Sequence, residues 1–201
     1  MTRTSYLAIG ASGPQGLRDI RTFLALLPNT IDAVVLVVLH RPFHATSQLQ
    51  SVLQSQTSIP VKVCETGEML ERSAIYVGEP SEHLSLYSAG RGILVHDPKR
   101  YFRNRTIDLL FESVALHAGS KSIGVVLAGA SDDGARGLAA IRNAQGHTFV
   151  STPSIGTGDG MPENAVAHNR HVSAIAPIPR IAELVIAATQ AEVSDYQRTE
   201  N

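Results

Sequence analysis

Short, mostly apolar runs alternate along the chain with longer segments in which apolar residues recur at helical spacing. The apolar runs of strand length are Tyr6–Ile9, Ala33–Leu39, Ile123–Leu127 and Thr148–Val150. The segments of helical spacing are Leu17–Leu27, Thr106–His117, Ala135–Ala144 and Pro179–Thr189. This alternation is typical of βαβ units around a parallel sheet. The run AVVLVVL at Ala33–Leu39 has no polar position, which predicts a central strand buried on both faces.

Four shorter runs, separated by Gly, Pro and acidic residues, occupy the middle of the chain. They are Val61–Cys64, Ala74–Val77, Leu84–Tyr87 and Ile93–Val95. Their length and spacing predict a β-hairpin or meander at one edge of the sheet. The whole pattern predicts an α/β fold, a Rossmann-like three-layer sandwich with a mostly parallel central sheet and helices on both faces. No repeat or linker divides the pattern, so we expect one domain over residues 1–190 and a polar tail over 191–201.

Composition narrows the classes of function. The 201 residues carry a net charge of −1, which removes the electrostatic basis for general binding to nucleic acids or anionic membranes. The single cysteine, Cys64, excludes an intramolecular disulfide, agrees with a reducing compartment and lies in an apolar run typical of a core. The first apolar run is too short for a signal peptide, and no stretch reaches the roughly 18 apolar residues of a membrane helix. We therefore expect a cytoplasmic protein without a membrane-inserted segment.

Side chains of three chemical types follow three of the buried strands. Ser12 follows the first strand, His40 the second, and Asp132 and Asp133 a later one. In open parallel sheets, catalytic groups gather beyond the carboxyl ends of the strands. In a Ser–His–Asp triad the imidazole removes the serine proton and the carboxylate orients the imidazole. Amide groups at the helix start after Ser12, beginning with Gly13, could receive an oxyanion. The three loops together predict a hydrolase site.

Each of these residues also has a purely structural interpretation. Ser12 could cap the helix that follows it, and His40 could be a structural polar residue at a strand end. Asp132 and Asp133 could cap the next helix, or Asp133 and Gly134 could form a plain turn. Taken singly, these interpretations are the more common ones. The joint placement of all three chemical types after separate buried strands favours the triad.

Two other kinds of site fit the sequence less well. Gly10, Gly13 and Gly16 have the spacing of a dinucleotide-binding turn, but that site needs a charged residue where the second strand ends in Leu39-His40. No Tyr is followed four residues later by Lys, the pair used by short-chain dehydrogenases, so an NAD(P)-binding protein is the weaker hypothesis.

His40 and His44 have the i, i+4 spacing of a metal pair. Pro42 between them opposes a continuous helix, and no Glu accompanies them. We expect neither a metal nor a cofactor.

The order and spacing of several short motifs resemble the catalytic domain of chemotaxis protein-glutamate methylesterases of the CheB type, over about Tyr6 to Val172. The matching stretches are Ile9–Ser12, the strand ending in His40-Arg41-Pro42, Ile75–Glu79 with His83, His96-Asp97, Arg105–Ala115, the acidic turn Gly129–Gly134, and Gly160–Glu163. Each motif is short, and their order along the chain makes the resemblance specific.

The resemblance implies hydrolysis of glutamate γ-methyl esters on chemoreceptor-type proteins, and often deamidation of particular glutamines. Carried over by position, it makes Ser12 the nucleophile, His40 the base and Asp133 the orienting acid. The amide of Ala130 would help to bind the oxyanion, and Met161 would pack beside the site. Arg103 and Arg105 are candidates for holding an acidic receptor helix, although solvated surface charges explain them equally well.

Three features depart from the family pattern. Pro14 and Gln15 lengthen the loop after Ser12, and Pro14 has no amide hydrogen, so this loop could move the hydroxyl or remove an oxyanion donor. Losing one such donor typically costs about 100- to 1000-fold in turnover. The usual Arg-Pro-Ser start of the middle helix is one residue short at Arg105-Thr106, and no receiver domain is expected. The insertion of Pro14 and Gln15 supports an alternative, a catalytically weak or inactive module that binds a signalling partner.

Overall fold

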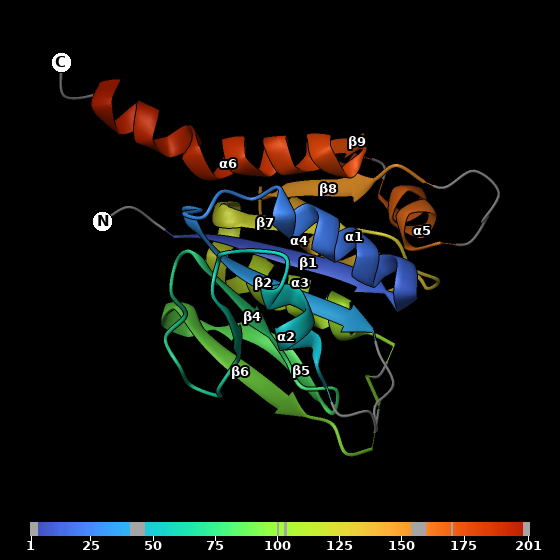
Figure 1. Cartoon of the computed structure of the whole chain (residues 1–201). Helices are drawn as coiled ribbons and strands as arrows, with labels where there is room; N and C mark the ends of the chain where they lie inside the picture. The colour runs from blue at the N-terminus through green and yellow to red at the C-terminus, as the bar shows by residue number, and fades with distance from the viewer. Residues whose placement is uncertain are drawn as a thin grey trace.

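The main sheet has seven parallel strands in the order β3-β4-β2-β1-β7-β8-β9 (Figure 1). The computed structural model describes residues 4–40, 47–99, 101–102, 104–153, 160–169 and 171–198, with side chains up to residue 190. The strands are β1 (Ser5–Ser12), β2 (Ala33–His40), β3 (Val61–Val63), β4 (Ala74–Val77), β7 (Ser122–Val126), β8 (His147–Ser151) and β9 (Ala174–Ala176). The chain runs from β1 to β2 on one side and later returns to β7 on the other. Ligands bind at such a reversal of strand order.

Helices cover both faces of the sheet. One face carries α1 (Gly13–Ala25), α2 (Leu49–Gln54) and α6 (Ile178–Arg198), and the other carries α3 (Thr106–Ala118), α4 (Ala135–Asn143) and α5 (Met161–His168) (Figure 1). Successive strand residues point to opposite faces. In β1, therefore, Leu7 and Ile9 join the first core while Ala8 joins the second. The structure confirms the predicted α/β fold with helices on both faces.

A separate antiparallel hairpin packs on the same face as α3. It consists of β5 (Glu82–Tyr87) and β6 (Arg91–His96), joined through a short 3-10 turn. Leu84 and Leu86 are buried with the residues of α3, and the Leu86 amide donates a hydrogen bond to Ser113 Oγ at 3.0 Å. The predicted hairpin is confirmed for these two runs.

The other two short runs of the middle segment are not part of a meander, and this expectation is corrected. β4 pairs in parallel with β2, and β3 pairs in parallel with β4. Val61, Ile75 and Val77 are buried in the core that α1 and α2 cover. Strands of three and four residues carry too little pattern to reveal their pairing direction.

Several helix boundaries differ from those expected. α1 begins at Gly13 rather than Leu17, because Pro14 occupies the first turn, where a missing amide hydrogen costs no helical hydrogen bond. α6 extends to Arg198, beyond the expected end at Thr189. The pattern of apolar positions did not predict α2, α5 and β9, none of which is longer than eight residues.

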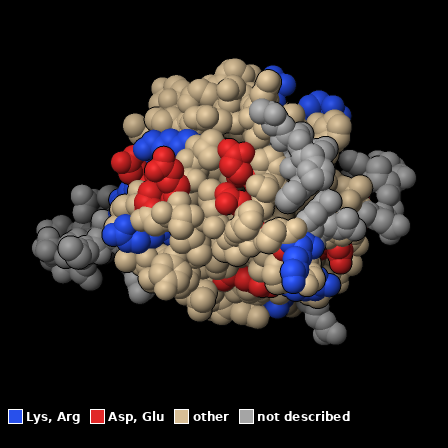
Figure 2. Space-filling view, turned by 90° about the horizontal axis from the view of Figure 1, so that it is seen from below, with Lys and Arg blue, Asp and Glu red and all other residues tan. Residues whose placement is uncertain are grey.

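Seen from below, groups of both charge signs lie scattered over a mostly uncharged surface (Figure 2). No helix in the described ranges combines the length and apolar character needed to cross a membrane.

Gly137 marks the close approach of α3 and α4. A β-carbon there would lie 2.5 Å from Phe111 Cβ and 3.1 Å from the Asp108 backbone. We predict that Gly137→Ala lowers the free energy of unfolding by about 1–3 kcal/mol in urea titrations, although alanine favours an isolated helix by about 1 kcal/mol. Asn143→Ala, at an exposed position of the same helix, should leave it nearly unchanged. A more stable Gly137→Ala protein would show that α3 and α4 can accommodate the added methyl group.

Candidate active site

Ser12 is the last residue of β1 and directly precedes α1. Its backbone is extended (φ −139°, ψ 144°), and its amide donates to the Ala128 carbonyl at 3.0 Å. The hydroxyl makes no capping hydrogen bond to α1, so the helix-cap interpretation does not describe this side chain. In the parallel ladder Ser12 is the register partner of His40 on β2. Backbones of neighbouring strands lie about 4.8 Å apart, so the alcohol and the imidazole project from adjacent positions.

The loop extension after Ser12 is absorbed into the first turn of α1. Gly13 has a positive φ of 67°, which suits glycine, and a β-carbon there would meet nothing within 4 Å. Gln15 donates to Asp19 Oδ1 at 2.6 Å, and Asp19 Oδ2 accepts the amide of Ala128 at 3.3 Å. The extended segment is thereby tied to the loop that follows β7.

His40 contacts the carboxylate of Asp133. Its Nε2 lies 2.5 Å from Asp133 Oδ2, and the two side chains are 17% and 0% exposed. Asp133 also accepts the amides of Ile107 at 2.9 Å and Asp108 at 2.8 Å, which belong to the first turn of α3. Three donors therefore orient this carboxylate. With Nε2 donating to Asp133, the nitrogen left to face a serine is Nδ1, the reverse of the serine-protease template.

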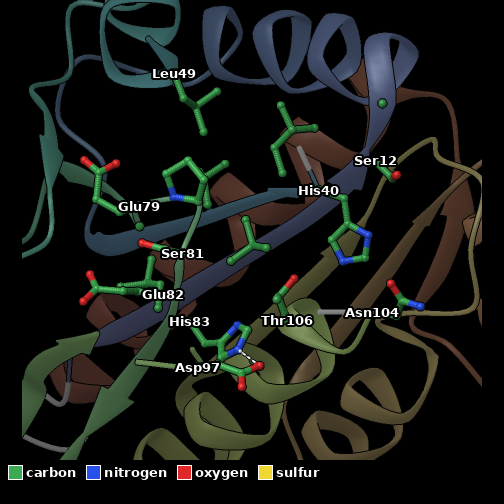
Figure 3. Close-up of a pocket in the computed structure, with 17 residues that line it drawn as sticks. Ser12, His40, Leu49, Glu79, Ser81, Glu82, His83, Asp97, Asn104 and Thr106 are labelled. Atoms are coloured by element: carbon green, nitrogen blue, oxygen red, sulfur yellow. Dashed lines mark hydrogen bonds and ion pairs between the residues drawn. The ribbon is translucent and has the colours of Figure 1, made fainter. Parts of the chain in front are cut away.

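Only half of a triad is closed by hydrogen bonds. Figure 3 shows Ser12 and His40 as neighbours at one end of a pocket. Among the described residues no hydrogen bond joins the Ser12 hydroxyl to His40. Such contacts are often long in structures without substrate.

Of the two candidate acids, the structure brings Asp133 to the imidazole and leaves Asp132 in solvent. The Asp132 side chain is 67% exposed and pairs with Arg136 at 3.7 Å. Neither acid caps α4, whose first residue follows Gly134 without a side-chain capping bond. The capping interpretation is therefore wrong for α4, and Asp133 instead accepts from the start of α3.

Two cavities meet at Ser12. One of about 390 Å³ extends from Ser12 and His40 along β2 to the hairpin. The other, of about 330 Å³, lies between the start of α1, the loop after β7 and the start of α5, and both Gly13 and Ala130 line it. The two residues expected to bind an oxyanion thus border the same space beside the serine.

Met161 and Arg105 lie outside the two cavities. Met161 is buried at the start of α5, where its amide donates to the Gly129 carbonyl at 2.7 Å. A β-carbon on Gly129 would lie 2.5 Å from both the Met161 sulfur and Ser12 Cβ, so Met161 packs behind the serine. Arg105 is turned toward carboxylates of α3, with Glu112 at 3.3 Å and Asp108 at 3.7 Å. Arg103 lies outside the described residues.

Two of the three glycines of the first loop, Gly10 and Gly16, have packing roles, whereas Gly13 has a positive φ. A β-carbon on Gly10 would collide with Ile107, and one on Gly16 would lie 2.7 Å from the Ala128 carbonyl oxygen and 2.8 Å from Ala11 Cβ. Close packing of strand, helix and loop therefore accounts for Gly10 and Gly16, and the positive φ accounts for Gly13, without a bound dinucleotide.

Two further candidates from the sequence are the single cysteine and the suggested metal pair. Cys64 is buried, as expected, and burial raises the pKa of its thiol to about 12. Within the ranges that the structure describes, no three His, Cys, Asp or Glu side chains are arranged to hold a metal ion. His44, the second member of the suggested metal pair, falls outside these ranges.

A second histidine–carboxylate pair lines the larger cavity. His83 Nε2 lies 3.1 Å from Asp97 Oδ2, and both residues are buried (Figure 3). Burial raises the pKa of Asp97, but hydrogen bonds from the Phe102 amide, His83 and the Tyr101 amide outweigh it and hold that pKa below its ordinary value. The sequence shows His83 and Asp97 only as parts of family motifs, because short separate strands do not reveal that these two side chains pair.

Comparisons with known proteins agree with this geometry. A sequence model of the CheB methylesterase family matches residues 7–185. A protein-glutamate methylesterase/protein-glutamine glutaminase of Cupriavidus metallidurans is 35% identical over 92% of this chain and 54% of its own length. One of Salmonella typhi is 32% identical over 92% of this chain and 53% of its own length. The chain thus spans about half the length of these curated relatives.

The fold is also similar to a solved structure. The CheB methylesterase catalytic domain of Thermotoga maritima superposes with a TM-score of 0.81 and 26% sequence identity, covering 90% of this chain and 97% of that domain. The chain belongs to the CheB methylesterase family.

Proposed function

We propose that this protein is a serine-dependent protein-glutamate methylesterase. The observation that carries the proposal is the 2.5 Å contact between His40 Nε2 and Asp133 Oδ2. His40 lies at the end of β2, in register with Ser12 on β1. A histidine oriented by a carboxylate and adjacent to a serine is the arrangement that activates a hydroxyl nucleophile. Membership of the methylesterase family supports the same chemistry.

In the proposed reaction, Ser12 Oγ attacks the γ-carbonyl carbon of a glutamate methyl ester while His40 Nδ1 takes the hydroxyl proton. The oxyanion of the tetrahedral intermediate is received by amide groups of Gly13 and Ala130, which border the smaller cavity. The intermediate collapses, the proton on His40 passes to the leaving methoxide, and methanol departs. Water then attacks the acyl-enzyme with His40 as base, which regenerates Ser12 and releases the glutamate side chain.

The same steps fit deamidation of glutamine, with ammonia leaving in place of methanol. The relatives from Cupriavidus metallidurans and Salmonella typhi are also named as protein-glutamine glutaminases, and we propose this activity for this chain as a second outcome of one mechanism. The proposed substrate is a methylated chemoreceptor-type protein, and the proposed compartment is the cytoplasm. A contact between Arg105 and an acidic receptor helix has weaker support, because Arg105 already pairs with Glu112.

Ser12→Ala should abolish methanol release from a methylated receptor, because no other group replaces the attacking oxygen. The measurement is methanol released from methyl-labelled receptor, alongside labelling with a fluorophosphonate probe, which should require both Ser12 and His40. Ser88→Ala, at an exposed position in the hairpin turn, is the matched control and should keep full activity. Full release by the Ser12 variant would remove Ser12 from the mechanism. Absent probe labelling of the wild-type protein would favour a binding module.

Asp133→Asn should lower turnover by about 10³- to 10⁴-fold, because the amide cannot hold His40 in the required tautomer. Asp132→Asn removes the same charge from the neighbouring exposed position and should change turnover by less than about twofold. Steady-state kinetics with methylated receptor compare the two. Equal losses in both variants would contradict the assignment of Asp133.

Pro14→Ala should change turnover by less than about threefold. Pro14 lies in the first turn of α1, while Gly13 directly after Ser12 keeps its amide hydrogen for the oxyanion. A rise of about 100-fold would instead show that proline removes an oxyanion donor. Circular dichroism of the variant checks that α1 is preserved.

A further inference from the structure

The starts of α3 and α4 are held together by two buried carboxylates, each of which accepts hydrogen bonds from the other's helix. Asp133, just before α4, accepts the amides of Ile107 and Asp108 in the first turn of α3. Asp108, in that first turn, accepts the amide of Gly134 at 3.0 Å and the amide of Gly137 at 2.8 Å. The exchange satisfies amides that would otherwise lack helical partners.

The carboxylate of Asp108 lies in an environment that disfavours its charge. Its side chain is fully buried, and its nearest cations are the half-exposed Arg136 at 3.4 Å and the partly exposed Arg105 at 3.7 Å. Burial is the largest cause that raises the pKa of Asp108; the Gly137 and Gly134 amides lower it, and the charge of Asp133 raises it. At pH values above that raised pKa, the ionised carboxylate of Asp108 therefore lowers the stability of the folded protein. A second buried acid beside the first is not what folding stability alone would select.

We propose that Asp108 is a positioning residue for the Asp133–His40 pair. It fixes the acidic turn through Gly134, the residue next to Asp133, and it adds negative potential behind the imidazole. Both effects favour the imidazolium that forms when Ser12 gives up its proton. This inference rests on the proposed function. Asp108 does not line either cavity at Ser12, so it acts through Asp133 rather than on the substrate.

Other charges bear on the same imidazole. The charged groups around Asp108 are Asp133, Arg136, Arg105 and Glu112. The cavity in front of His40 adds the titratable side chains of Glu79, Glu82, His83 and Asp97. The test must therefore change the charge at Asp108 without changing this cavity.

Asp108→Asn does so, because its amide oxygen can still accept from Gly134 and Gly137. We expect the acid limb of the kcat/KM profile to move to lower pH by about half a unit, since removal of a nearby negative charge makes the imidazole easier to deprotonate. Asp108→Ala also loses the acceptor, and kcat should fall by more than about tenfold. Asp132→Asn makes the same charge change at the exposed residue next to Asp133, and it should leave the acid limb of the kcat/KM profile in place.

Arg136→Gln gives a test of opposite sign at a half-exposed position. Removal of this cation strengthens the negative potential, so the acid limb should move to higher pH. This variant keeps the inference testable if the Asp108 variants fold poorly. Profiles of Asp108→Asn and Arg136→Gln that both superimpose on that of the wild type would overturn the inference and leave Asp108 a structural cap.

A measurement without turnover separates this inference from the proposed function. The titration of the His40 ring protons, assigned by their loss in His40→Gln, can be followed by NMR in the wild type and in Asp108→Asn. A midpoint that moves to lower pH in the variant supports the inference even if Ser12→Ala still releases methanol, which would refute the hydrolase. An unmoved midpoint refutes the inference even if Ser12 proves essential.

Discussion

The carboxylate of Asp133 is the point on which the proposed chemistry depends. Its two oxygens accept hydrogen bonds from His40 and from the first amides of α3, so one side chain joins β2, α3 and the loop after β7. These partners are 93, 26 and 25 positions away in the sequence. Because all three donors point at one carboxylate, the orientation of His40 is set by the packing of the domain rather than by its own strand.

The use of the two histidine nitrogens follows from the order of the strands. Ser12 and His40 are in register on neighbouring strands whose backbones lie about 4.8 Å apart, so the ring nitrogen nearer the backbone, Nδ1, suits the serine. Asp133 follows β7, on the far side of β1, and is reached only by the outer nitrogen, Nε2. The sheet order thus explains why the nitrogen roles are reversed relative to the serine proteases.

The departure from the family pattern after Ser12 is part of a regular helix start. Pro14 and Gln15 belong to the first turn of α1, where they line the smaller cavity beside Ser12, and Gln15 donates a hydrogen bond to Asp19. The amide directly after Ser12 belongs to Gly13, which keeps its hydrogen. The two buried acids at the starts of α3 and α4 affect each other, because burial and then the charge of Asp133 raise the pKa of Asp108.

The sequence by itself determined the alternation of strands and helices, and with it the edge at which Ser12, His40 and Asp133 would meet. Parallel strands place their carboxyl ends together, so residues that follow buried apolar runs share an edge whatever the details of packing. It also carried the family resemblance, which the comparisons confirm.

Tertiary structure alone decided the pairing of the short strands, the short helix α5 and the contacts of Asp97 and Asp108. Runs of three or four residues have no periodicity that distinguishes a hairpin from a parallel strand. The exchange between Asp108 and Asp133 joins two helix starts 25 residues apart, and only the close approach of α3 and α4 at Gly137 brings them within hydrogen-bonding distance. Local sequence encodes a residue's tendency to cap or coil, whereas the choice of a remote partner depends on how the layers pack.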